Sequence, residues 1–104
     1  MTALDIIEAN RGALVALCRS YAVKRLRLFG SAVKGEFDFA SSDLDFLVEF
    51  HPPLDMNVFH QFIDLKLDLE DLFGRRVDLV TWKAVKDPLF RERAEATAIE
   101  LYAA

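Results

Sequence analysis

The sequence predicts an α/β domain in which a small mixed sheet of three or four strands is flanked by helices. Three short apolar stretches have the character of strands, at 25–29, 43–50 and 77–81. Three longer stretches repeat apolar residues at helical spacing, at about 3–20, 55–73 and 87–102. The 104 residues, 53% of them hydrophobic, suit one domain with a buried core. We therefore expect a single domain over 1–104.

Composition narrows the range of functions. A net charge of −4 argues against binding nucleic acid directly, because such binding depends on clustered Lys and Arg that neutralise phosphates. The single cysteine, Cys18, cannot form an internal disulfide and is expected to be a buried apolar side chain. No apolar run approaches the ~20 residues of a membrane span, and the N-terminus lacks a signal pattern. We expect a cytoplasmic protein without membrane contact.

The first helix is predicted from a start signal and a periodic pattern. Thr2 followed by Asp5 matches a capping box, in which each side chain caps the backbone of the other residue. Apolar residues then recur at helical spacing, although Arg11 interrupts their stripe. We expect one helix from about Ala3 to Ser20.

The first strand leads into a Gly-Ser turn. Within Arg25–Phe29 the leucines alternate with Arg25 and Arg27, so we expect the leucines to face the interior and both arginines to face solvent. Gly30 and Ser31 follow, and a short helix is predicted from Ser31 to Gly35. Lys34 lies three residues after Ser31 and therefore on the same side of that helix, where its ammonium group can reach a phosphate.

The second strand, Asp43–Phe50, begins with two acids. Residues i and i+2 of a strand point to the same face, so Asp43 and Asp45 project side by side. Leu47 shares their face and the opposite face is apolar, which indicates a central strand covered by helices. The proline pair after His51 ends the strand, because proline cannot donate to a β-ladder.

The rest of the chain is predicted as helix, strand and helix. Asp55 is the expected N-cap of a helix that ends before Gly74, and the strand Val77–Thr81 follows, carrying Asp78. Trp82 is interpreted as a cover over the end of the sheet, with contact to a nucleotide base as the alternative. Asp87 and Pro88 predict the start of a last helix, which we expect to run to about Tyr102.

Two adjacent carboxylates and a Gly-Ser turn together indicate a metal-bound polyphosphate. Like charges in one site oppose each other's ionisation, and a divalent cation removes that cost. Mg²⁺ prefers oxygen ligands and is usually held by one or two carboxylates and substrate phosphates. Glycine lets the backbone approach a ligand closely, and N–H groups at a helix start attract anions.

These residues resemble the signature of the minimal nucleotidyltransferases of the DNA polymerase beta superfamily: Gly-Ser, a spacer, Asp-x-Asp, and a third acid on a later strand. The matching positions are Gly30, Ser31, Asp43, Asp45 and Asp78. The resemblance extends from about residue 24 to residue 82, and more loosely to Leu101 and Tyr102. Two features depart from the family pattern: the spacer is one residue longer than usual, and Ala32 occupies a position where arginine is common.

The resemblance implies a polymerase-beta-like nucleotidyltransferase fold and a role for each motif residue. Asp43, Asp45 and Asp78 would be the catalytic residues and would hold magnesium, with two ions expected. Gly30, Ser31 and Lys34 would bind the nucleotide. Asp78 would also help to deprotonate the attacking hydroxyl.

The absence of an acceptor-binding domain favours one branch of this superfamily. Stand-alone members resemble the antitoxins of HEPN and nucleotidyltransferase toxin–antitoxin pairs, which transfer AMP from ATP to a tyrosine of the HEPN ribonuclease toxin. The resemblance thus implies a magnesium-dependent protein adenylyltransferase that forms a hetero-oligomer with its toxin.

Two alternatives stay open. Ala32 and the long spacer are compatible with an antitoxin that neutralises its toxin by binding alone. A transferase that modifies a small hydroxylated molecule would use the same residues but normally needs a second domain to form its pocket.

Overall fold

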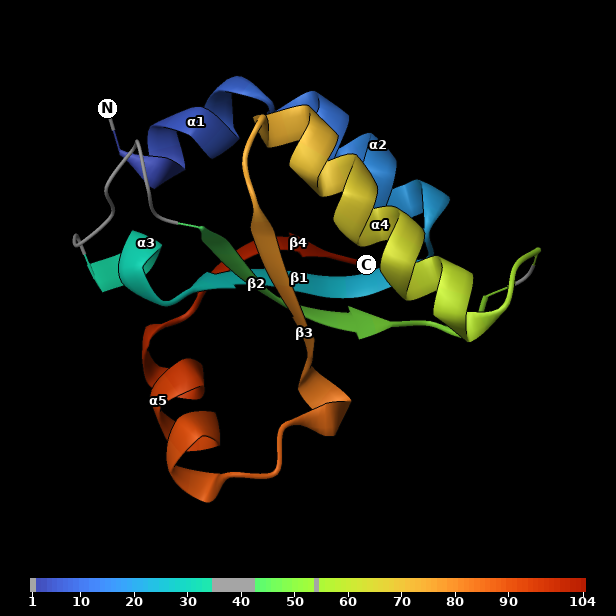
Figure 1. Cartoon of the computed structure of the whole chain (residues 1–104). Helices are drawn as coiled ribbons and strands as arrows, with labels where there is room; N and C mark the ends of the chain where they lie inside the picture. Colours follow the sequence, from blue (N-terminus) through green and yellow to red (C-terminus); the bar gives the residue numbers. More distant parts are fainter. Residues whose placement is uncertain (1, 35–42, 54) are drawn as a thin grey trace.

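The computed structural model describes residues 2–34, 43–53 and 55–104, and within them helices pack on a four-stranded sheet (Figure 1). In chain order the elements are α1 (Ala3–Ala9), α2 (Arg11–Ser20), β1 (Val23–Phe29), α3 (Ser31–Lys34), β2 (Leu44–Phe50), α4 (Val58–Phe73), β3 (Val77–Thr81), the short 3-10 helix η1 (Trp82–Ala84), α5 (Pro88–Thr97) and β4 (Ile99–Ala103). None of the described helices is long and apolar enough to cross a lipid bilayer.

The sheet is mixed, as predicted, and its strand order is β3-β2-β1-β4. Strand β1 runs antiparallel to both β2 and β4, whereas β2 and β3 run parallel. A parallel pair needs a crossover connection, and α4 provides it. Strand β2 is therefore an interior strand, which confirms the central position expected for it, and β3 lies at an edge.

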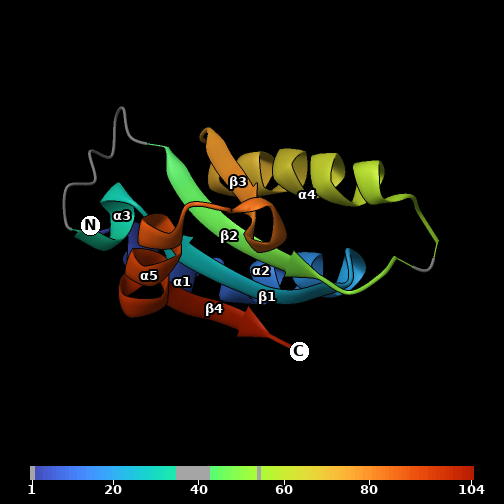
Figure 2. The ribbon, with the colours of Figure 1, turned by 90° about the horizontal axis from the view of Figure 1, so that it is seen from below.

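The two faces of the sheet have different cover (Figures 1 and 2). Helices α1, α2 and α4 pack on one face, and α5 lies against the other. The face under the three helices forms the core with buried residues of those helices. Its fully buried members include Leu26 and Leu28 of β1, Phe46 and Val48 of β2, and Ile7, Leu14, Leu65 and Leu69 of the helices.

The expected helix over residues 3–20 is wrong in one respect, because it is broken at Asn10. The predicted capping box at Thr2 and Asp5 is present, so α1 begins as expected. The Asn10 side chain donates to the Ile6 carbonyl, and the backbone leaves the helical conformation there. Arg11, which interrupts the apolar stripe, then turns to donate to the Leu101 carbonyl at 2.6 Å.

The helix α4 begins two residues later than Asp55 would place it. Asn57 is the N-cap, and its side-chain oxygen accepts from the His60 N–H at 2.8 Å. At the other end Gly74 adopts the left-handed conformation (φ 64°), which confirms its predicted place after the last helical turn.

The expected last helix to Tyr102 is also wrong beyond Thr97. Ala98 is extended, and residues Ile99–Ala103 form β4, which pairs antiparallel with β1. This segment buries Leu101 while its neighbours Glu100 and Tyr102 stay more exposed, so its pattern has the period of two typical of a strand. Pairing with the open side of β1 outweighs the helical tendency of the preceding residues.

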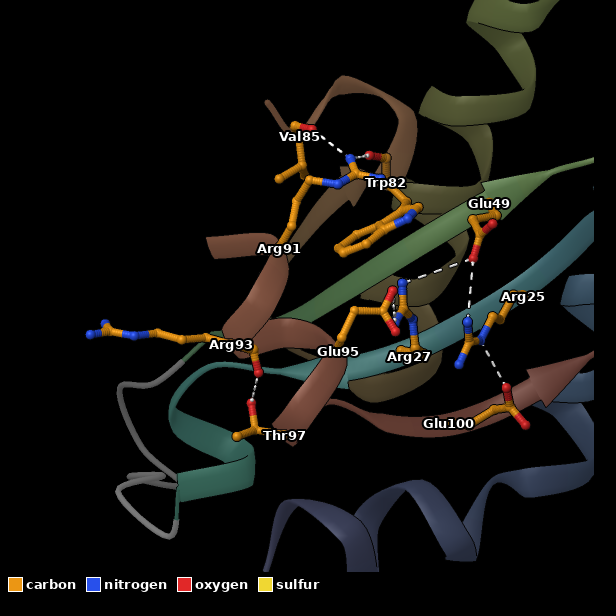
Figure 3. Close-up of polar contacts among 10 residues, drawn as sticks. All are labelled: Arg25, Arg27, Glu49, Trp82, Val85, Arg91, Arg93, Glu95, Thr97 and Glu100. Carbon is orange, nitrogen blue, oxygen red and sulfur yellow. Dashed lines mark hydrogen bonds and ion pairs between the residues drawn. The ribbon is translucent and has the colours of Figure 1, made fainter. Parts of the chain in front are cut away.

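Arg27 is buried rather than exposed, which corrects the expectation for β1. Its side chain is 3% exposed and lies beneath η1 and α5, within 4.0 Å of carboxylate oxygens of Glu49 and Glu95 (Figure 3). Successive side chains of β1 therefore point to two faces of the sheet that are both covered, and neither face is open to solvent at Arg27.

Candidate active site

Three carboxylates meet near the amino ends of β2 and β3. In the parallel register Asp45 of β2 pairs directly with Asp78 of β3. Paired residues of neighbouring strands point to the same face. Asp43 stands two residues before Asp45, immediately before β2 begins. The structure thus brings Asp45 and Asp78 together on the face opposite the main helical layer, and the negative charge of Asp43 acts on Asp45 from the residue before β2.

Asp45 has the least favourable environment of the three. Burial raises the pKa of Asp45 to about 6, and the negative charges of Asp78 and then Asp43 add to the effect. Asp45 is half-buried on an interior strand, whereas Asp78 is exposed on the edge strand. A cation placed among these carboxylates would favour their ionised forms, because an opposite charge within a few ångströms lowers a carboxyl pKa.

Gly30 lies against Asp45. The register aligns Phe29, the last residue of β1, with Asp45, so the turn that follows passes beside that carboxylate. Gly30 has φ of 75°, and a Cβ added to it would lie 2.3 Å from Asp45 Oδ2. Both facts exclude larger residues, because L side chains rarely adopt this conformation and the space is already filled. Ser31 directly follows and begins α3.

Lys34 was the cation expected to reach a phosphate. Its backbone ends α3, but its side chain and the spacer residues 35–42 lie outside the described parts of the chain. The role of Lys34 therefore stays a prediction. Ala32, the position where the family commonly has arginine, packs partly buried against the hydrophobic core.

Arg76 is a neighbour of the acids to which the sequence gave no role. Its Nε lies 3.9 Å from Asp43 Oδ1, and its side chain is 86% exposed. The Arg76 carbonyl also accepts a hydrogen bond from the Leu44 N–H at 3.1 Å, so the hydrogen bonding between the two strands begins at Arg76, one residue before β3. The only signal in the sequence is the pair of arginines before β3.

Trp82 covers the sheet beyond the acids (Figure 3). Its indole lies between two guanidinium groups, with Arg91 Cζ 4.2 Å and Arg27 Cζ 4.5 Å from the ring centroid. Arg91 also donates to the carbonyls of Trp82 and Val85, which fastens α5 to η1. The ring therefore acts as a cover over the sheet end, the favoured interpretation from the sequence, and its contacts leave the alternative of stacking on a base without support.

The carboxylates fit a magnesium ion that binds together with a nucleotide. In the described part of the chain no group of three or more Asp, Glu, His or Cys side chains is arranged to hold an ion unaided. Magnesium, however, is commonly held by one or two carboxylates while substrate phosphates complete its shell. The site meets that requirement in three ways. The carboxylates are hard oxygen donors, their repulsion at Asp45 would be relieved by a cation, and the Gly-Ser turn lies beside them.

Comparison with known proteins identifies the family. Residues 11–101 match the model of the nucleotidyltransferase domain. A relative named as a putative protein adenylyltransferase of Methanocaldococcus jannaschii is 37% identical over 95 residues, which cover 91% of this chain and 90% of that protein. A solved structure described as a putative minimal nucleotidyltransferase is 37% identical and superposes with a TM-score of 0.76, covering 95% of each chain.

A more distant likeness concerns the fold alone. A solved complex described as tri-AMPylated Shewanella oneidensis HEPN toxin with MNT antitoxin has a chain that superposes with a TM-score of 0.63 at 19% identity, covering 93% of this chain and 72% of that chain. The nearer matches extend over nearly the whole sequence. This chain belongs to the nucleotidyltransferase domain family and is a minimal nucleotidyltransferase of the polymerase-beta-like fold.

Proposed function

We propose that this protein is an antitoxin that transfers AMP from ATP to a tyrosine hydroxyl of a HEPN ribonuclease toxin, in a reaction that requires magnesium. The observation that carries the proposal is the pairing of Asp45 with Asp78 directly beside Gly30. The family makes the protein a nucleotidyltransferase. The name of the relative from Methanocaldococcus jannaschii supports protein as the acceptor and AMP as the transferred group. The HEPN toxin complex supports the identity of the partner.

The residues of the site divide into two tasks. Gly30 and Ser31 would hold the β- and γ-phosphates, because their turn offers backbone N–H groups and lies against Asp45, which would hold the magnesium. Asp43 and Asp45 would hold magnesium on the nucleotide side, and Asp78 would complete a second site. Magnesium, when bound, stabilises negative charge on the phosphates and on the attacking and leaving oxygens.

The reaction is an in-line displacement at the α-phosphorus. The tyrosine oxygen attacks and forms the new P–O bond, and the bond to the oxygen that bridges the α- and β-phosphates breaks. Pyrophosphate leaves with that electron pair. Asp78 receives the hydroxyl proton and later returns it to solvent, a task suited to an exposed acid on an edge strand.

Mass spectrometry of the partner tests the proposal. Incubation of the wild-type protein with ATP, Mg²⁺ and the HEPN ribonuclease should add one or more AMP groups to the ribonuclease. The double variant Asp43→Asn/Asp45→Asn should slow this transfer on the order of a thousandfold or more, since several kcal/mol of charge stabilisation are removed. An unchanged partner mass with wild-type protein contradicts the proposal.

A binding-only antitoxin is the second candidate. It is favoured by Ala32, which packs on the core and leaves that position of the turn without a cation. This candidate predicts that the double variant protects cells from the toxin as well as the wild type does. Loss of protection together with loss of transfer supports the enzyme.

A further inference from the structure

A concave site lies at the opposite end of β2 and β3 from the acids. It is a cleft of about 640 Å³, and its walls come from the ends of both strands, from η1 and from the start of α4. Its inner surface is largely apolar, with Val48, Phe50, Pro53 and Val58 among the lining residues. The volume falls in the usual range for sites that receive a ligand or a side chain.

The cleft is separate from the acids. Three residue steps along β2 lead from Asp45 to Val48, the first residue of the strand that lines the cleft, which is about 10 Å at about 3.3 Å per residue, and Asp43 and Phe50 are on the order of 20 Å apart. The carboxylates at one end therefore cannot act on a group held at the other. A protein surface, in contrast, is wide enough to contact both.

The deepest polar group of the cleft is already satisfied. Gln61 is 1% exposed, and its Nε2 donates to the carbonyls of Tyr21 and His51 at 2.9 Å each. Arg91, also in the lining, donates to the carbonyls of Trp82 and Val85. The interior of the cleft thus has few free donors for a polar small molecule, whose sites normally contain several well-placed polar groups. It suits an apolar side chain.

The rim of the cleft is cationic. Lys24 and Lys83 line it and are exposed, and within the described residues neither side chain has an ion pair. The one acid in the lining, Glu49, lies 3.9 Å from both Arg25 and Arg27. On a chain with a net charge of −4, this end is a local positive region. It is complementary to acidic residues.

Exposed apolar side chains extend the surface beyond the cleft. Val58, at its edge, is 68% exposed, and the next residue, Phe59, is 66% exposed. Two consecutive exposed apolar residues beside an apolar cleft indicate an interaction surface larger than a small molecule would cover.

We propose that this cleft docks the protein that accepts AMP, through an apolar side chain of the partner that enters the cleft and acidic residues beside it that meet Lys24 and Lys83. The inference rests on the proposed function for the identity of the partner. Docking at one end of β2 and β3 holds the partner while its tyrosine reaches the acids at the other end. The cleft then determines the affinity for the partner, and the acids determine the rate of AMP transfer.

Two surface variants and two matched controls test this. Val58→Asp places a charge at the cleft edge, and Leu67→Asp changes an exposed apolar residue (51%) farther along the same helix. Lys83→Glu reverses a rim charge, and Lys86→Glu reverses an exposed lysine outside the lining. All four positions are exposed, so the fold should persist, and circular dichroism checks it.

Calorimetry measures the dissociation constant of each variant for the purified HEPN ribonuclease. The rate of AMP transfer to the ribonuclease is measured at limiting and at saturating ribonuclease concentration. We expect Val58→Asp and Lys83→Glu to weaken binding at least tenfold, with transfer at saturating partner near the wild-type rate. The controls should change binding less than twofold. The Lys83→Glu variant should also show a weaker dependence of binding on salt.

The outcomes separate this inference from the proposed function. If the cleft variants bind like the wild type, or if the wild type does not bind the ribonuclease, docking at the cleft is overturned. If the cleft variants lose binding while the wild type transfers no AMP, the docking surface stands and the enzymatic proposal fails.

Discussion

The two faces of the sheet are made by the same strands and differ in what determines their residues. On the face under α1, α2 and α4, buried aliphatic and aromatic side chains fill space together, and Phe46 stacks on Phe73 with ring centroids 6.1 Å apart. On the opposite face the charged residues have specific neighbours, such as Gly30 beside Asp45 and Trp82 with two glutamates around Arg27. The first face mainly determines stability. The second places charge where chemistry needs it.

The largest effect should come from the first face. Phe46→Ala removes a fully buried ring and should lower the free energy of unfolding by about 4 kcal/mol. Val80→Ala, on the half-buried opposite face of β3, should cost about 1 kcal/mol. Urea denaturation of both variants measures the contrast. Similar losses at the two positions would remove the distinction between the faces.

A smaller loss is expected from Gly30→Ala. The new Cβ would meet Asp45 Oδ2 in a backbone conformation that disfavours L side chains, so we expect destabilisation of about 2 kcal/mol and impaired nucleotide binding. Gly12→Ala is the matched control, because Gly12 lies within α2 with nothing within 4 Å of an added Cβ. That variant should gain up to about 1 kcal/mol. A harmless Gly30→Ala would show that the turn does not constrain Asp45.

The smallest effect concerns the charge of Asp45. Its pKa is raised from 3.8 to about 6, so the folded state binds the proton more tightly than the unfolded chain does. The contribution of the Asp45 carboxyl to the free energy of unfolding is fully present below about pH 4, where the group is protonated. It is lost as the pH rises through about 6. The loss at neutral pH should be about 1 kcal/mol once partial solvent screening is allowed for.

Thermal unfolding in EDTA measures this effect as a difference between proteins. Asp45→Asn should be more stable than the wild type at pH 7.5 and about equally stable at pH 4. Added Mg²⁺ and ATP should raise the wild-type melting temperature more than that of the variant. A difference that stays constant between pH 4 and pH 7.5 would show that Asp45 is not strained by its neighbours.

Local rules predicted much of the site. The strand predicted for Asp43–Phe50 places Asp45 on the face opposite the core, and Asp78 lies on the same face through the parallel register of β2 and β3. The glycine was expected to permit close approach, and the structure shows that its neighbour is a carboxylate. The role of these residues remains a proposal for the experiments above.

The features that the sequence did not predict depend on distant contacts. Strand β4 follows α5 without a glycine or proline between them, and its strand state comes from pairing with β1, far away in the chain. Arg27 looks like a solvent-facing residue of an alternating strand, yet its cover comes from η1 and α5. The cleft at the far end of β2 has no motif, because its residues come from five separate segments.

The contact between Arg11 and the Leu101 carbonyl joins residues 90 positions apart. During synthesis on the ribosome, the second helix therefore cannot be fixed in place by this bond until Leu101 has been made. Strand β1 waits equally long for β4, its second neighbour. The nascent protein should stay open at this side of the sheet until β4 has left the ribosome, and chaperones would meet it in that state.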